Sequence, residues 1–259
     1  MTDLDTAHAA MEAAPDDDAL RLRFYERLAD SELFMLLGAD PVDDKIEPSL
    51  FDIEDRKFAL VFDREERLAD FVGRAAPYAG LPGRALVQML TGQGIGLAFN
   101  LEVAPSAMLI PTEAVDWLAA ILQHAPDETE ARLQEIAAPT GLPEAVITGL
   151  DRKLAIAAGL AKWAYLAAAT YDGGMKGHVL AFVDAQEGAE KALANAAGEA
   201  LTFSGIEAGT MDVLFCRSSD PLAARLAKVG LRFDLPEPVK ARPMPIAPGS
   251  DPDKPPKLR

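Results

Sequence analysis

The sequence is poor in the side chains that bind metals and form disulfides, with one cysteine and three histidines among 259 residues. The single cysteine, Cys216, cannot form an internal disulfide or a cysteine-rich zinc site, so we expect a reducing compartment. His8, His124 and His178 lie far apart, and none has a second histidine at the spacing of a helical zinc motif. We therefore predict that the protein binds no metal and no cofactor.

Basic residues are also scarce, because 25 lysines and arginines stand against 41 aspartates and glutamates and give a net charge of −16. Nucleic acids and anionic membranes bind to cationic surfaces, so we expect neither as a partner. The longest apolar run, residues 154–170, contains Lys162 and is too short for a membrane-spanning helix. The acidic start, Met1–Asp5, lacks the features of a secretory signal. These absences predict a cytoplasmic protein.

The acidic residues are concentrated in the first half of the chain. Residues 1–123 contain 23 acidic and 10 basic side chains, whereas residues 124–259 contain 18 and 15. The last segment, residues 236–259, includes eight prolines and has a net charge of +2, which predicts a flexible tail. We expect any charged partner, a protein with a basic surface, to dock on the first half.

The apolar segments predict an α+β protein with two domains, residues 1–123 and 124–235, followed by the tail. We expect each domain to be a sandwich of a mixed sheet and helices. In the second domain the expected elements follow the order β-α-β-β-α-β of a ferredoxin-like sheet. The expected strands of that domain span residues 131–137, 163–171, 178–184 and 211–216. In the first domain, Asp63 and Glu66 have the spacing of a capping box at a helix start.

Motifs of common catalytic and nucleotide-binding sites are missing. The glycine-rich stretch Gly92–Gly96 follows a predicted helix and enters a strand, which reverses the order that a phosphate-binding loop requires. No serine lies in a G-x-S-x-G elbow. Cys216 is expected to be an inert core residue, although the adjacent Arg217 could lower its pKa. We therefore predict no catalytic residue.

The best candidate for a ligand site is the strand end that follows the glycine-rich stretch, where short polar side chains and backbone amides can converge. Its side chains are Gln88, Asn100, Glu102 and Ser106. The alternative is that this region caps a helix and builds a turn. His178 is a further candidate, because it shares a predicted hairpin with Asp172 and Asp184. The alternative for His178 is a local hydrogen bond within the hairpin.

Several segments resemble the N-terminal domain of the SseB family, and the resemblance covers residues 17–123. They are Arg23–Leu28 ahead of an apolar strand, Phe58–Leu68, Gly94–Asn100 and Ser106–Pro111. Lys162–Ala167 is similar to the family's C-terminal domain. Pro-Gly-Ser-like residues usually follow the asparagine in the family, whereas Leu101–Ser106 follow it here. The resemblance implies a cytoplasmic bacterial protein, and it supplies no catalytic residues.

Three functions are compatible with these observations. The first is a non-enzymatic interaction or regulatory protein, since catalytic motifs are missing and the first half is strongly acidic. The second is a protein that binds a small ligand such as an amino acid, or a weak enzyme, at the strand end described above. The third is a component associated with type III secretion. This third function and a link to serine sensitivity rest on the family resemblance alone.

Overall fold

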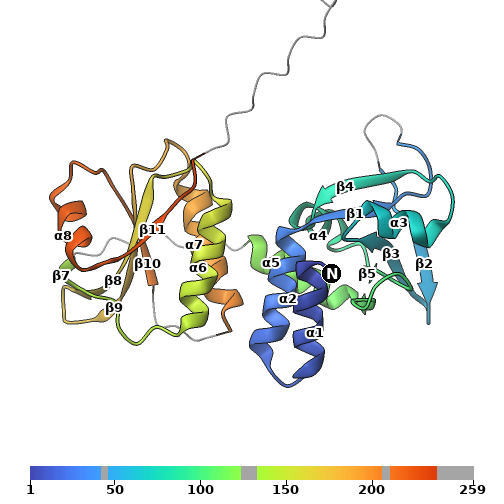
Figure 1. Cartoon of the computed structure of the whole chain (residues 1–259), viewed down its shortest axis with the longest axis horizontal. Helices are drawn as coiled ribbons and strands as arrows, with labels where there is room; N and C mark the ends of the chain where they lie inside the picture. The colour runs from blue at the N-terminus through green and yellow to red at the C-terminus, as the bar shows by residue number, and fades with distance from the viewer. Residues whose placement is uncertain (42–45, 124–132, 206–210, 238–259) are drawn as a thin grey trace, which may run out of the picture.

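The computed structural model describes residues 1–41, 46–123, 133–205 and 211–237. These residues form eight helices and eleven strands, and the strands make two separate mixed sheets (Figure 1). The predicted α+β class is therefore confirmed. We call residues 1–123 the first domain and residues 133–237 the second domain. The predicted boundary at residue 124 and all but two residues of the predicted tail lie outside the described residues.

The first domain combines five helices with six strands. Its elements are α1 Asp3–Ala13, α2 Asp18–Asp30, β1 Glu32–Leu36, β2 Leu50–Ile53, β3 Arg56–Phe62, α3 Glu65–Val72, β4 Tyr78–Pro82, α4 Gly83–Leu90, β5 Ile95–Phe99, β6 Met108–Ile110 and α5 Thr112–Gln123. Asp17 is the N-cap of α2, and its carboxylate accepts hydrogen bonds from the backbone amides of Ala19 and Leu20. The sharp turn between α1 and α2 is thus fixed by a local contact.

The capping box predicted at Asp63 is wrong. Helix α3 begins at Glu65 with Arg64 as its N-cap, and no side chain caps its first turn. The Asp63 carboxylate instead accepts hydrogen bonds from Thr2 at 2.6 Å and from Arg67 at 2.7 Å. The Asp63 carboxylate therefore bonds to one residue four positions ahead and to one 61 residues away, and it does not cap the helix.

Strand β3 organises the first sheet, whose order is β4-β1-β3-β5-β6. Strand β3 pairs with β5 in parallel along one edge. Along its other edge it pairs antiparallel with two strands, with β2 near its start and with β1 near its end. Residues 58–62 of β3 are all buried. A strand covered on both faces has this continuous apolar character.

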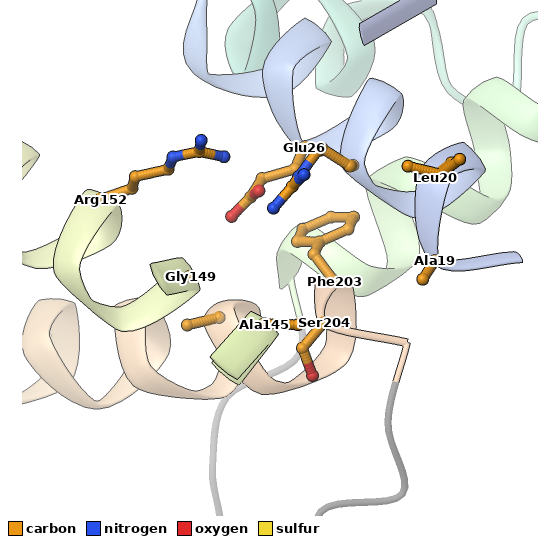
Figure 2. Close-up of a pocket in the computed structure, with 10 residues that line it drawn as sticks. Ala19, Leu20, Glu26, Ala145, Gly149, Arg152, Phe203 and Ser204 are labelled. Carbon is orange, nitrogen blue, oxygen red and sulfur yellow. The ribbon is translucent and has the colours of Figure 1, made fainter. Parts of the chain in front are cut away.

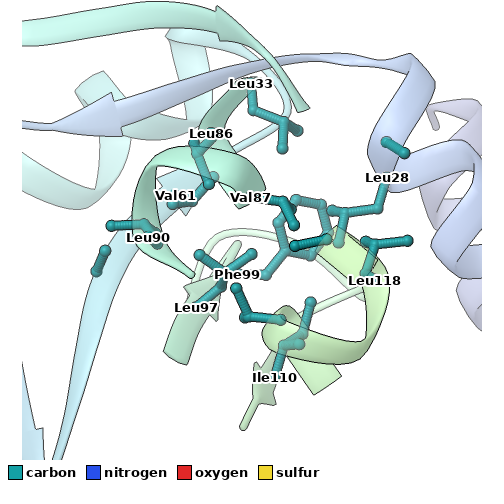
Figure 3. Close-up of a cluster of buried hydrophobic side chains, with 14 of the residues drawn as sticks. Leu28, Leu33, Val61, Leu86, Val87, Leu90, Leu97, Phe99, Ile110 and Leu118 are labelled. Carbon is teal, nitrogen blue, oxygen red and sulfur yellow. The ribbon is translucent and has the colours of Figure 1, made fainter. Parts of the chain in front are cut away.

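Helices cover both faces of the first sheet. Helices α1, α2, α4 and α5 enclose one cluster of buried side chains, in which Leu28, Leu97 and Phe99 are fully buried (Figure 3). On the opposite face, Leu68 of α3 packs with Phe62. Phe203 belongs to the larger cluster although it comes from the second domain. The two domains therefore share part of one hydrophobic core.

The second domain is built around its longest strand, β8. Its elements are β7 Leu133–Ala137, α6 Glu144–Ile156, β8 Trp163–Tyr171, β9 Lys176–Val183, α7 Glu190–Phe203, β10 Met211–Cys216, α8 Pro221–Val229 and β11 Leu231–Asp234. Strand β9 pairs with one edge of β8, and β7 and β11 share the other edge. Helices α6 and α7 lie on the side of this sheet that faces the first domain (Figure 1).

The ferredoxin-like arrangement predicted for this domain is not confirmed. The succession β-α-β-β-α-β is present along the chain and is followed by α8 and β11. A split βαβ unit, however, places another strand between its two parallel strands. Here β9 and β10, which α7 connects, are direct parallel neighbours.

No helix in the described part of the chain has the length and apolar character to cross a membrane.

Candidate functional site

Asn100 follows β5 in a left-handed backbone conformation. Its φ is 49°, a region that asparagine tolerates better than most residues, and its side chain is fully buried. The side-chain oxygen accepts a hydrogen bond from the backbone amide of Asp63 at 3.2 Å, and the side-chain nitrogen donates to Ser106 Oγ at 3.0 Å. Asn100 thus ties the end of β5 to the segments that precede α3 and β6.

Ser106 extends this contact to the first helix. Its hydroxyl donates to Asp5 Oδ1 at 2.6 Å, and Arg67 donates to the two oxygens of Asp5 at 3.0 and 2.6 Å. Burial alone would raise the pKa of Asp5, but hydrogen bonds from Arg67, Ser106 and Thr2 outweigh it and hold that pKa well below its ordinary value. We call Asp5, Arg67, Asn100 and Ser106 the α1 anchor, because they fasten α1 to the first sheet.

The other three predicted site residues lie elsewhere. Gln88 is exposed on α4, and Glu102 is exposed in a turn with a φ of 60°. His178 lies in β9 of the second sheet, where its Nε2 is 3.2 Å from the carbonyl oxygen of Thr140. Of the five predicted residues, the structure therefore brings together Asn100 and Ser106. Since both are fully buried, neither presents a polar atom to a ligand, and ligand binding by the five stays a prediction.

The glycine-rich stretch forms a turn, as the alternative interpretation expects. Gly92 and Gly94 have φ values of 71° and 72°, which glycine adopts without steric cost. Asp116 of α5 accepts hydrogen bonds from the hydroxyl of Thr91 at 2.8 Å and the amide of Gly92 at 2.9 Å, and these bonds lower its pKa. The turn after α4 is therefore held by a carboxylate and is not arranged around a phosphate.

Cys216 is half-buried at the end of β10. Burial raises the pKa of its thiol, and the carboxylates of Asp220 and Asp184 raise it further, so the lowering considered for Arg217 does not occur. A raised pKa disfavours the nucleophilic thiolate.

Among the residues that the structure describes, no group of three or more His, Cys, Asp and Glu side chains is placed to hold a metal ion.

A second polar cluster, which no sequence pattern predicted, lies between the domains. Lys153 of α6 is only 4% exposed, and its ammonium lies 2.7 Å from Asp30 Oδ2 and 2.9 Å from Glu199 Oε2. Arg84 lies 2.8 Å from Asp30 and 3.3 Å from Glu199. Glu26 completes the set at 3.9 Å from Lys153. We call these five residues the junction cluster.

The junction cluster joins α2 and α4 of the first domain to α6 and α7 of the second. Burial raises the pKa of Glu26, and the nearby Lys153 partly opposes that rise. For Arg84, burial lowers the pKa, but Glu199 and Asp30 raise it by more. Buried charges are tolerated when they are paired in this way. The cluster therefore favours one arrangement of the two domains.

A cavity of about 210 Å³ lies beside the junction cluster. Arg23 and Glu26 line it from α2 and Arg152 lines it from α6, while Gly149 and Phe203 contribute apolar surface. Figure 2 shows the side chains of Arg152 and Glu26 extending from their helices into the same space. This is a concave site with both charged and apolar walls, which is the usual character of a small-ligand pocket.

Comparison with known families gives one match, which spans most of the first domain. Residues 5–117 match the family model described as the SseB protein N-terminal domain. No curated protein and no solved structure matches the chain. The match does not extend into the second domain, so the similarity of Lys162–Ala167 to the family's C-terminal domain stays a prediction. The first domain therefore matches the SseB N-terminal domain over residues 5–117, which supports the family resemblance found in the sequence.

Proposed function

We propose that this protein is a non-enzymatic interaction or regulatory protein of the SseB family that acts in the cytoplasm, and that its first domain binds a partner with a basic surface. The observation that carries the proposal is the charge imbalance of residues 1–123, which contain 23 acidic and 10 basic side chains. An acidic surface attracts a basic partner and accelerates its association. A single, half-buried cysteine is compatible with a reducing compartment.

A concentrated part of the imbalance is the α1–α2 tip, which we define as residues 12–18. The tip projects from the first domain where α1 turns into α2 (Figure 1). It carries four exposed carboxylates, those of Glu12, Asp16, Asp17 and Asp18. Among the described ion pairs, only Asp18 of these four has a cationic partner, Arg21. The tip is thus available to an approaching basic surface.

The α1 anchor supports the non-enzymatic part of the proposal. Its carboxylate, guanidinium, amide and hydroxyl groups are the kinds of group that catalysis uses. In this structure these groups form hydrogen bonds with one another. Asp5, for example, accepts hydrogen bonds from Arg67 and Ser106. Groups arranged in this way stabilise a helix contact instead of facing a substrate.

The test is a pull-down with the full chain at low salt, about 0.05 M, and at high salt, about 0.5 M. The test variant carries Glu12→Gln, Asp16→Asn, Asp17→Asn and Asp18→Asn, and the amide oxygen that Asp17→Asn introduces can still cap α2. The matched control neutralises four exposed carboxylates of the second domain by Asp151→Asn, Asp172→Asn, Glu187→Gln and Glu190→Gln. We expect the unmodified chain and the control to recover a stoichiometric partner at low salt and less of it at high salt. The tip variant should recover less of this partner than either of them. Equal binding by the tip variant and the control would contradict the proposal.

A further inference from the structure

Two arginines line the cavity between the domains, and a third, Arg27, follows on the same helix as one of them. Arg23 and Arg152 line the cavity, and neither forms an ion pair with a carboxylate in the described part of the chain. The adjacent Arg27 lies 3.9 Å from Glu26, and its Nη2 is buried without a hydrogen-bond partner among the described residues. A buried donor without an acceptor is costly. Arg27 does not line the cavity, so Arg23 and Arg152 are the arginines that an anion entering the cavity would contact.

The charges of the three arginines act on one another. Burial lowers the pKa of Arg152, and the like charges of Arg27 and Arg23 lower it further. The carboxylates of Glu26 and Asp3 oppose this effect without cancelling it. Glu26 is also shared with Lys153 of the junction cluster, so it cannot neutralise the arginines alone.

The domain junction as a whole carries an excess of positive charge. It holds five cations, Arg23, Arg27, Arg84, Arg152 and Lys153, and four carboxylates, Asp3, Glu26, Asp30 and Glu199. The chain around it has a net charge of −16. The surrounding negative charge partly compensates this excess, but neighbouring cations still repel one another, and a bound anion would reduce that repulsion.

We propose that the cavity between α2 and α6 binds one small oxyanion, a phosphate or carboxylate group of a metabolite, with Arg23 and Arg152 as its direct ligands. A guanidinium presents a planar fork of donors that matches both kinds of group. This site is separate from the α1–α2 tip and goes beyond the proposed partner binding.

The cavity restricts the ligand to a small molecule. Its volume of about 210 Å³ is below that of pockets for drug-sized ligands. Gly149 and Phe203 offer an apolar wall, which suits a short hydrocarbon portion next to the charged group. The exposed carboxylates of Asp16 and Asp17 lie just before α2 and repel extended polyanions. A nucleic acid is thereby disfavoured.

The anion would also connect the two domains. Arg23 belongs to α2 of the first domain and Arg152 to α6 of the second. A ligand that accepts hydrogen bonds from both reduces the repulsion between them and adds a contact across the junction. Binding to the folded state alone raises its stability, by an amount that grows with the logarithm of the ligand concentration above Kd. We therefore expect ligand binding to be visible in thermal unfolding.

The test uses the full chain with inorganic phosphate and, in a separate arm, succinate, each compared with sodium chloride at equal ionic strength. Calorimetry should give saturable binding of one anion per chain, and the Tm should rise in at least one arm. Arg152→Gln and Arg23→Gln should each weaken binding by about tenfold or more. The control Arg21→Gln removes an exposed arginine from the same helix and should leave binding unchanged.

Glu26→Gln gives an independent test that does not remove an arginine. The Glu26 carboxylate competes with an incoming anion, so its neutral variant should bind phosphate or succinate more tightly. A response to phosphate alone assigns a phosphate ligand, and a response to succinate alone assigns a carboxylate. The proposal is overturned if sodium chloride gives the same Tm shift, or if Glu26→Gln and the two arginine variants bind like the unmodified chain.

Discussion

The ammonium of Lys153 lies 2.7 Å from the carboxylate of Asp30, and this contact joins α6 of the second domain to α2 of the first. Lys153 also lies 2.9 Å from Glu199 and 5.6 Å from the ring centre of Phe203, the residue that α7 inserts into the core of the first domain. Polar and apolar contacts between the domains therefore meet at one lysine. Its loss should affect both.

Replacing Lys153 by methionine should destabilise the folded chain by about 3 kcal/mol. The substitution keeps much of the apolar stem but leaves the buried carboxylates of Asp30 and Glu199 with only Arg84 as a partner. Breaking a buried pair by removing one member costs more than the pair itself contributes. The free energy of unfolding, measured with a chemical denaturant, checks the prediction.

The matched control for this substitution is Lys162→Met. Lys162 also pairs with a carboxylate, that of Asp184 at 2.6 Å, but its side chain is 61% exposed. Exposed pairs contribute little to stability. Adding Glu199→Gln to Lys153→Met should recover part of the loss, because it removes one unpaired charge. Equal destabilisation by Lys153→Met and Lys162→Met would contradict the assigned role of the junction cluster.

Replacing Gly83 by alanine should destabilise the first domain by about 3 kcal/mol or more, because α4 begins in direct contact with α2. A Cβ atom at Gly83 would lie 1.9 Å from the carbonyl oxygen of Leu28 and 2.9 Å from its carbonyl carbon. Backbone atoms cannot rotate away, so the helices must separate. Gly38→Ala is the control, since the nearest atom to its Cβ would be the Pro48 oxygen at 4.0 Å. Similar unfolding midpoints for the two variants would refute the predicted clash.

The fold could be predicted from the sequence wherever apolar residues formed a clear local pattern. The predicted strands 163–171 and 211–216 coincide with β8 and β10. Strand β4 was not predicted, because it contains Gly80 and Pro82 and lies at a sheet edge, where proline is tolerated. Strand β11 escaped prediction for another reason, since only one of its four residues is buried. The pairing of β9 with β10 is not encoded in the order of elements.

The polar contacts were harder to predict than the strands. Asp5 and Ser106 are 101 residues apart in the sequence, and no spacing rule connects them. Lys153 did carry a local signal, because it lies next to Leu154 on the buried side of α6. A lysine on an apolar helix face needs buried carboxylates as partners. Identifying Asp30 and Glu199 as those partners required the packing of three helices against one another.

Replacing Asp5 by asparagine should weaken the attachment of α1 and destabilise the chain by about 2 kcal/mol. The substitution removes the charge that accepts hydrogen bonds from Arg67 and Ser106, and it leaves the guanidinium of Arg67 with Asp63 as its remaining partner. Hydrogen exchange should increase in α1 more than in α6. Asp3→Asn is the control, because Asp3 is exposed on the same helix and should change neither measurement.

The pH dependence gives a second measurement on the same carboxylate. Hydrogen bonds hold the pKa of Asp5 in the folded chain well below its ordinary value of 3.8. A group with a lowered folded pKa binds protons more readily when unfolded, so its stabilising contribution is present above about pH 4 and is lost as the pH falls below that value. The stability difference between the unmodified chain and Asp5→Asn should therefore be constant near neutral pH and shrink below about pH 4. A difference that persists unchanged at pH values below that range would show that the variant acts through packing and not through the charge of Asp5.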